Sequence, residues 1–200
     1  NYNSSYLERA LEQMLDEADS PEVTRFLRAV DVRIDGFRVE KAPEGRGQRV
    51  LVKHEVDGKG YELRLSEESA GTQKLMGLAA FLLAALERGG TVVVDELDAK
   101  LHPKLLRYVI LLFKDPEVNK HGAQLIFSSQ DVSTMRNDVF RRDEIWFAAR
   151  GEGEASQLWS LADIHEANGN LVSKNAAFDK QYLSGRYGAD PYLTRIEEWD

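Results

Sequence analysis

Two adjacent carboxylates, Asp95 and Glu96, follow the apolar run 91–94 and are the strongest candidates for chemistry in the chain. Four β-prone residues in a row predict a buried strand, and α/β sheets bind their ligands at the carboxyl ends of strands. A carboxylate there can hold Mg²⁺, while its neighbour orients or deprotonates an attacking water. Because successive residues of an extended strand face opposite ways, the two carboxylates would divide these tasks. The alternative is that acidic residues stand here only because loops are solvated.

A second candidate is the segment 69–73, Ser-Ala-Gly-Thr-Gln, which precedes the most apolar helix pattern of the chain. Small residues and a hydroxyl at a helix N-terminus present backbone N–H groups and the positive end of the helix dipole to an anion. The segment therefore has the chemistry of a phosphate-binding site. The alternative is a helix cap, in which Ser69 or Thr72 satisfies the N–H groups of the first turn.

Polar residues also follow the next two apolar segments. His102 stands before Pro103 at a helix start, where it is a metal ligand, a helix cap or simply a surface histidine. The β-prone run 124–127 ends in Ser-Ser-Gln-Asp at 128–131, which brings further polar side chains to the same edge of the sheet. The alternative is that one of these residues caps a following helix.

Hydrophobic periodicity predicts the elements that must position these residues. The first third of the chain is typical of two helices and three strands, with a hairpin turn at Asp57-Gly58: helices 6–18 and 21–30, then strands 32–39, 50–56 and 61–65. From Ser66 onward strands and helices alternate: helix 71–88, strand 91–95, helix 103–114, strand 123–128, a short helix after 131, and strands 144–149 and 157–161. This alternation predicts an α/β fold in which a sheet with parallel strand pairs is covered by helices. We therefore expect a helical and β-meander segment at 1–65 and an α/β lobe at 66–200.

Composition limits the classes of partner. The 200 residues carry 34 acidic and 26 basic side chains, a formal charge of -8, so no overall basic field draws the chain to DNA or to anionic lipid. No apolar run reaches the roughly 20 residues that span a bilayer, so we expect no membrane partner. The chain has no cysteine, which removes disulfides and thiolate chemistry and fits a reducing, cytoplasmic location.

The order of these segments resembles the C-terminal half of an ABC-type ATPase head. The resemblance is to the SMC/RecF-like group, which includes AAA-family ATPases of bacterial phage-defence and restriction-associated systems. Residues 69–73 match the signature motif of that family, and residues 95–96 match its Walker B acids. Residues 98–102 match the D-loop, and residues 128–131 match the switch region. The stretches DPEVNKHGAQLIFSSQD and YLSGRYGADP extend the likeness over 66–191.

The resemblance implies the fold of a P-loop NTPase head that binds ATP and Mg²⁺. In this chain Asp95 would assist Mg²⁺, and Glu96 would position or activate the attacking water. Gln130 would sense the γ-phosphate. Such heads form a dimer around ATP, and closure of the dimer would be read by an arm or by an associated effector protein in a defence or DNA-related assembly.

The resemblance also implies that two further segments, the signature motif and the D-loop, contact a nucleotide shared with a second head. In the signature motif, Ser69 and Gly71 would contact the γ-phosphate that the other head holds. The D-loop would lie at the same interface. The nucleotide-binding residues implied in this way are Ser69, Gly71, Thr72, Gln73, Asp98 and His102.

The chain departs from the family pattern at two places. Gln130 stands where the family usually has histidine; an amide can hydrogen-bond a γ-phosphate but carries no positive charge, so hydrolysis would be slowed or lost. No G-x-x-x-x-G-K-[ST] motif occurs in the 200 residues, and in the family this P-loop precedes every motif found here. We therefore expect the Walker A segment to lie outside this sequence, which would be a fragment of the complete head.

Two other functions remain open. Gln130 and the lack of a P-loop motif favour a non-hydrolysing module that senses nucleotide or serves as a scaffold in a larger complex. A Mg²⁺-dependent nuclease would instead use Asp95 and Glu96, with Asp98 or Asp131, as a two-metal cluster. The nuclease is the weaker alternative, because adjacent carboxylates on an extended strand diverge.

Overall fold

The structure is a computed structural model that describes residues 21–30, 34–41, 48–150, 155–166 and 168–189. The chain divides into two compact units, 1–129 and 130–200. The boundary expected from the sequence, between 65 and 66, falls within the first unit. The expected helix 6–18 lies outside the described residues.

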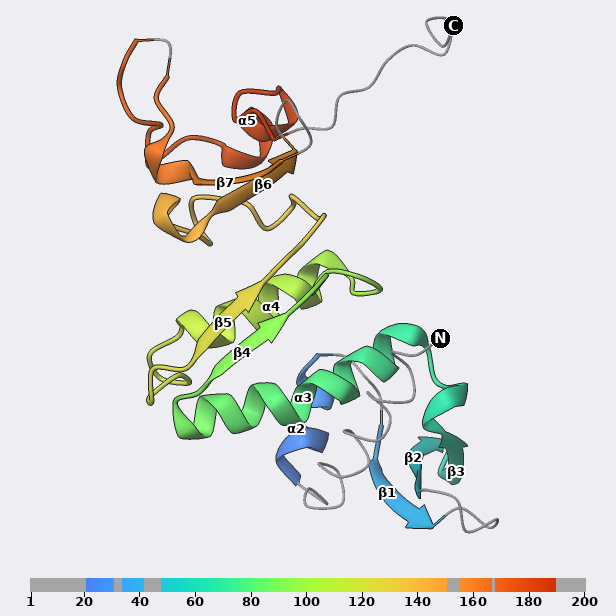
Figure 1. Cartoon of the computed structure of the whole chain (residues 1–200). Helices are drawn as coiled ribbons and strands as arrows, with labels where there is room; N and C mark the ends of the chain where they lie inside the picture. Colours follow the sequence, from blue (N-terminus) through green and yellow to red (C-terminus); the bar gives the residue numbers. More distant parts are fainter. Residues whose placement is uncertain (1–20, 31–33, 42–47, 151–154, 167, 190–200) are drawn as a thin grey trace, which may run out of the picture. The chain divides into compact units, whose positions relative to one another are not determined.

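An antiparallel three-stranded sheet follows helix α2 (Pro21–Ala29) in the first unit (Figure 1). Its strands β1 (Gly36–Lys41), β2 (Gln48–Val56) and β3 (Lys59–Arg64) lie in the order β1-β2-β3. The turn between β2 and β3 has φ of 52° at Asp57 and 71° at Gly58, the two left-handed residues of a type I′ hairpin. The hairpin predicted at this dipeptide is therefore confirmed.

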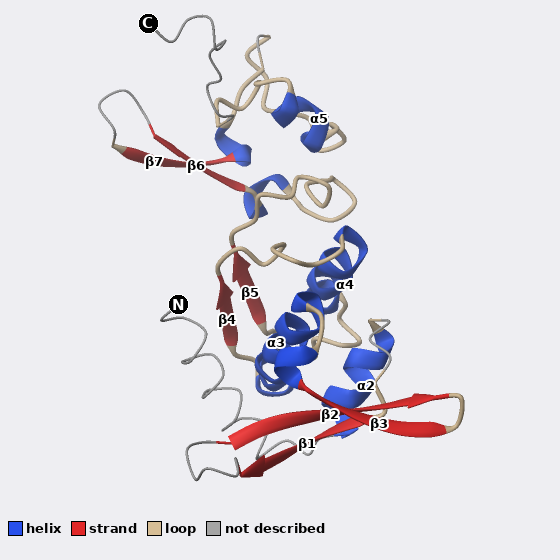
Figure 2. Cartoon of the chain, turned by 90° about the vertical axis from the view of Figure 1, so that its right-hand side faces the viewer, coloured by secondary structure: helices blue, strands red, loops and turns tan. Residues whose placement is uncertain are grey.

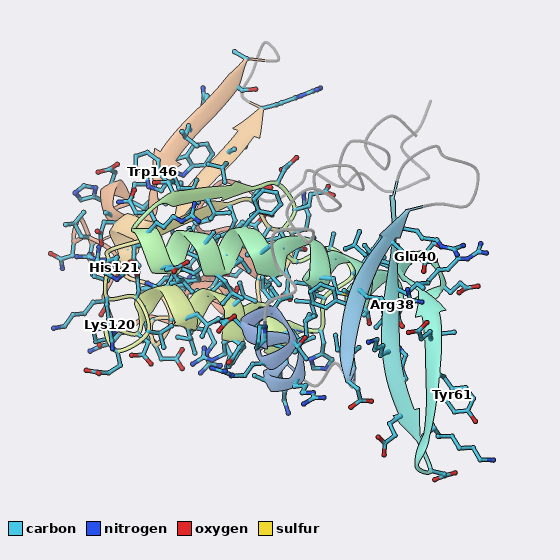
Figure 3. All side chains as sticks on the ribbon, turned by 90° about the horizontal axis from the view of Figure 1, so that it is seen from below. Arg38, Glu40, Tyr61, Lys120, His121 and Trp146 are labelled. Atoms are coloured by element: carbon cyan, nitrogen blue, oxygen red, sulfur yellow. The ribbon has the colours of Figure 1, made fainter. Side chains whose placement is uncertain are left out.

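Side chains alternate across this sheet between an apolar and a charged face. The apolar face contributes Phe37, Val50 and Val52 to the core. On the opposite face, Arg38 donates to both carboxylate oxygens of Glu62, at 3.0 and 2.8 Å, and also to Glu40, which lies beside it in Figure 3. The charged face therefore neutralises much of its own charge.

Helix α3 (Ala70–Arg88), preceded by the 3₁₀ turn η1 (Leu65–Glu67), is central to the first unit. Its buried residues, among them Leu75 and Leu82, join one core cluster with residues of α2, of the sheet and of α4 (Pro103–Lys114). The helix ends at Gly89, whose φ is 80°. A Cβ added to Gly89 would stand 2.4 Å from the carbonyl oxygen of His121, so only glycine allows this close contact.

Strands β4 (Thr91–Val94) and β5 (Gln124–Phe127) form a parallel pair, as the alternating pattern predicts. Both α3 and α4 lie on one side of this pair (Figure 2). Val92 and Leu125 face these helices, whereas Val93 is 73% exposed and Ile126 is 56% exposed on the other side. The expectation that 91–94 is a buried strand is thus wrong for one of its faces, because a run of four β-prone residues does not show whether one face is covered or both.

The second unit contains an antiparallel hairpin and a short helix. The hairpin joins β6 (Trp146–Arg150), which follows the 3₁₀ turn η2 (Arg142–Glu144), to β7 (Ser156–Ser160), which leads into η3 (Leu161–Asp163). Helix α5 is Phe178–Leu183. In the core of the second unit, Phe147 stacks on Tyr182 with ring centroids 5.7 Å apart. Tyr187 belongs to the same core, and burial raises its pKa to about 12.

The short helix predicted after 131 is wrong. Residues 132–139 form turns instead, with hydrogen bonds such as that from the Met135 amide to the Val132 carbonyl at 3.0 Å. The carboxylate of Asp131 accepts a 2.6 Å hydrogen bond from the Ser133 amide. This Asx-type turn competes with helix formation at the place where the sequence pattern suggests a helix start.

Within the described part of the chain, no helix is both long enough and apolar enough to cross a membrane.

Candidate functional site

Asp95 and Ser128 are held side by side where the two parallel strands end. Val94 pairs with Phe127 in the register, and the Ser128 amide donates to the Val94 carbonyl at 3.1 Å. The Ser128 hydroxyl donates to the Asp95 carboxylate. Both side chains are exposed, so the carboxyl end of the β4–β5 pair opens to solvent.

Glu96 leaves the strand rather than continuing it. Strand β4 ends at Val94, and Glu96 has a φ of 49°, a left-handed conformation that L-residues other than glycine rarely adopt. The same Ser128 hydroxyl that donates to Asp95 accepts a 2.8 Å hydrogen bond from the Glu96 amide. The expectation that the two acids alternate along an extended strand is therefore wrong for Glu96, which is an exposed turn residue.

Residues 96–101 form two successive turns that fix the backbone of Glu96. The amide of Ala99 donates to the Glu96 carbonyl at 3.0 Å, and the amide of Leu101 donates to the Asp98 carbonyl at 3.0 Å. Leu97 is completely buried and donates its amide to the Ser128 carbonyl at 3.0 Å. Strained backbone that the surroundings hold in place is common at functional sites, and Glu96 fits that description.

The segment 69–73 caps helix α3, so the capping interpretation is confirmed. The Ser69 hydroxyl accepts a 3.1 Å hydrogen bond from the Thr72 amide and lies 2.9 Å from the Thr72 hydroxyl. The Gln73 side chain donates to the Glu68 carbonyl at 2.8 Å. Ser69 itself is exposed.

The start of α3 packs directly against the turn that follows β4. A Cβ added to Gly71 would lie 2.9 Å from the Lys100 carbonyl oxygen, so glycine is required for the close approach. The Lys74 ammonium donates to the Glu96 carbonyl at 2.5 Å. Burial lowers the pKa of Lys74, while the nearby carboxylates of Asp98 and Glu96 act in the opposite direction. The two strongest sequence candidates, 69–73 and 95–96, thus belong to one cluster.

Lys74 and Ser128 are the residues that sequence reasoning underrated. Ser128 could have been found, because it follows β5 at the position that matches Asp95 after the parallel strand β4. Lys74 carries no such signal. It donates to a backbone carbonyl 22 positions away. Every residue has a backbone carbonyl, so the sequence does not indicate which one a lysine contacts.

His102 acts as the cap of α4. Its Nδ1 accepts a 3.1 Å hydrogen bond from the Lys104 amide, and Pro103 occupies the first turn. Asp98 is half-buried in the turn beside Lys74. A direct contact of either residue with a nucleotide remains a prediction.

Gln130 is exposed and is the first residue of the second unit. Its predicted role as a phosphate sensor remains a prediction.

The donor set at the end of β4 suits Mg²⁺ better than a transition metal. Within the described ranges, no group of three or more His, Cys, Asp or Glu side chains is arranged to hold a metal ion. Mg²⁺ needs no such cage, because it usually keeps several waters and takes one or two carboxylates together with phosphate oxygens. An exposed Asp95 carboxylate beside a serine hydroxyl therefore fits Mg²⁺ that arrives with a nucleotide.

Comparison with known proteins identifies the family to which the chain belongs. A family model described as "AAA domain, putative AbiEii toxin, Type IV TA system" matches residues 1–136. Among solved structures, the chain is similar at 17% identity and a TM-score of 0.43 to one described as "Structural biochemistry of ATP-driven dimerization and DNA stimulated activation of SMC ATPases". That likeness covers 69% of this chain and 88% of that chain. No curated protein matches the chain.

The family match covers well over half of the 200 residues and includes both candidate segments, 69–73 and 95–102. The chain therefore belongs to the AAA-domain family of nucleotide-binding ATPases described as putative AbiEii toxins of type IV toxin–antitoxin systems.

Proposed function

We propose that the end of the β4–β5 pair is the Mg²⁺ and water side of an ATP-hydrolysing site. Asp95 assists the metal ion that accompanies ATP, and Glu96 positions or activates the attacking water. When bound, Mg²⁺ neutralises charge that develops on the phosphates. Phosphoryl transfer leaves the protein mainly positioning and electrostatic stabilisation to supply. An oriented Asp95 carboxylate next to a glutamate whose backbone is fixed suits that work.

The observation that carries this proposal is the double hydrogen bond of Ser128. One hydroxyl orients the Asp95 carboxylate and fixes the backbone of Glu96. A solvated loop that merely happened to be acidic would need neither this clamp nor a left-handed glutamate. The clamp also places both acids at the edge where α/β sheets bind ligands.

The signature segment is proposed to act on a nucleotide held by a second head. Ser69 and Gly71, with Thr72 and Gln73, would contact the γ-phosphate bound in the other head, and Asp98 and His102 would line the same interface. The exposure of Ser69 supports this role. ATP would then join the two heads, and Gln130 would sense the terminal phosphate.

The cradle for the α- and β-phosphates is proposed to come from a Walker A segment outside these 200 residues. A G-x-x-x-x-G-K-[ST] loop supplies backbone N–H groups and a lysine to those phosphates, and the sequence holds no such motif. The family description names a putative AbiEii toxin of a type IV toxin–antitoxin system and thereby supports a nucleotide-binding ATPase in such a system. A role in bacterial defence, with an effector protein that reads the closed dimer, is part of the proposal.

A non-hydrolysing nucleotide sensor or scaffold is the second candidate. Gln130 favours it, because an amide at the switch position cannot offer the positive charge that a histidine can.

The Glu96→Gln variant of the complete protein, with its P-loop, tests the proposal. The substitution keeps the size of the side chain but removes the base, so we expect ATP turnover to be lost while ATP-dependent dimerisation persists. The matched control is Glu87→Gln, an exposed acid at the far end of α3, which should turn over ATP at the original rate. Unchanged hydrolysis in Glu96→Gln would remove this residue from its role. If the original protein binds ATP without turnover, the sensor is the correct function.

A further inference from the structure

Among the described strands, β3 has one edge that pairs with no other strand. It is the last strand in the order β1-β2-β3, and all six of its residues are exposed. An edge strand that is long and exposed is a template for pairing with another chain, and proteins normally blunt it. The hairpin carries Val56, Tyr61 and Leu63 on the same face, and these side chains are 55%, 51% and 41% exposed. Figure 3 shows Tyr61 on this hairpin.

The backbone groups at this edge can be assigned. The Arg64 amide donates to the Glu67 carboxylate at 2.7 Å rather than to β2, so Arg64 belongs to the set that faces the open edge. Orientation alternates along a strand of an antiparallel pair, so Gly60 and Glu62 face the open edge as well. Glu67 blocks the edge at Arg64 and leaves the amides and carbonyls of Gly60 and Glu62 for a further strand.

Gly60 is a glycine that the fold of one chain does not require. Its φ lies outside the left-handed region, and a Cβ added there would meet nothing within 4 Å. Glycine inside a strand loses packing and costs chain entropy. One reason to keep it is the close approach of another backbone, and Gly60 stands at the open edge, where such a backbone would come.

We propose that β3 pairs antiparallel with β3 of a second copy of this chain, with Tyr61 opposite its own counterpart. In this register Gly60 of each copy lies opposite Glu62 of the other. The unblocked backbone groups of both copies then form two hydrogen-bonded pairs on either side of the tyrosines. The Arg64 position, blocked by Glu67, takes no part in these pairs.

The side chains of this register are also complementary. Leu63 lies opposite the aliphatic stem of Lys59 of the second copy on the apolar face. Arg64 lies opposite Gly58 and so approaches the turn that carries the Asp57 carboxylate. Glu62 meets only glycine across the interface and keeps both of its contacts with Arg38 in its own chain. This pairing is separate from the proposed nucleotide-dependent dimer and needs no ATP.

The absence of cysteine from the chain makes a direct test possible. Opposite residues of a non-hydrogen-bonded antiparallel pair have Cα atoms about 4.5 Å apart, within the range that a disulfide spans. We therefore expect Tyr61→Cys to form a disulfide-linked dimer under mild oxidation without nucleotide. Val56→Cys and Leu63→Cys are the matched controls. Both thiols are exposed on the same face, but neither meets its counterpart in this register, so both should remain largely monomeric on a non-reducing gel.

Sedimentation of the chain without cysteine substitutions gives a second readout. The original chain should show a concentration-dependent dimer, and Tyr61→Lys, which places two ammonium groups opposite each other, should sediment as a monomer with an unchanged unfolding midpoint. A monomer at every concentration, or faster cross-linking of Leu63→Cys than of Tyr61→Cys, would overturn the proposal. Failure of ATP hydrolysis in Glu96→Gln would not affect either result.

Discussion

Ser128 is uncharged, but its side chain holds both acidic residues of the candidate site in place. Its single hydroxyl donates to Asp95 and accepts from the Glu96 amide. Removal of a residue that orients a metal-binding carboxylate typically lowers activity about 10- to 100-fold. We expect a loss of this size in kcat for ATP hydrolysis by the Ser128→Ala variant of the complete protein. Ser156→Ala, an exposed serine on β7, is the control, and an equal kcat in both variants would show that the clamp is irrelevant.

Under the same proposal, Gln130 influences the rate of ATP hydrolysis. An imidazole can carry the positive charge that an amide lacks, so Gln130→His should raise the rate of hydrolysis. Steady-state phosphate release from the complete protein measures this. A lower rate in the histidine variant would mean that the glutamine is fitted to its own hydrolytic geometry.

At the scale of elements, the start of α3 packs directly against the turn after β4. The contact depends on Gly71, because a methyl group there would meet the backbone carbonyl of Lys100 at 2.9 Å. Overpacking of this kind costs about 1–3 kcal/mol, and a backbone atom cannot rotate away. We expect Gly71→Ala to lower the free energy of unfolding of the chain by about this amount in urea titration.

Gly36→Ala is the matched control for this substitution. A Cβ at Gly36 meets nothing within 4 Å, and its φ lies outside the left-handed region. Its stability should stay close to that of the original chain. If both variants are equally stable, the helix start and the turn are not locked together.

The elements that the sequence predicts well are those with strong local signals. Helix α4 begins at Pro103 and ends at Lys114, as predicted, because proline marks its first turn and the apolar stripe has helical period. The β2–β3 hairpin follows from Asp57-Gly58. The predicted helix after 131 fails because the Asp131 side chain closes a local turn first.

The candidate site could be predicted in its residue types but not in its geometry. Acids at the end of an apolar strand identify Asp95 and Glu96, and a small-residue helix start identifies Ser69. The left-handed Glu96 could not be foreseen, since the conformation depends on contacts with Ser128 and Lys74 that lie far away in the sequence. Long-range backbone contacts of this kind leave no periodic pattern.

At the scale of the whole molecule, each unit has its own hydrophobic core, and the first unit carries both candidate segments, 69–73 and 95–102. The β4–β5 pair is exposed on the face away from α3 and α4, at Val93 and Ile126. In the proposed complete head, the parallel pair with its acidic end would be one part of a larger nucleotide site. It would contribute the metal-facing and water-facing acids, and the Walker A segment would add the phosphate cradle.

The position of Asp95 relative to the terminal phosphate of ATP tests this account most directly. The measurement is an experimental structure of the complete protein with Mg²⁺ and a non-hydrolysable ATP analogue. We expect an Asp95 oxygen either about 2.1 Å from the metal or joined to it through one water, with the Glu96 carboxylate facing the γ-phosphate. A bound nucleotide whose metal is coordinated without Asp95, and whose γ-phosphate lies away from Glu96, would contradict the account.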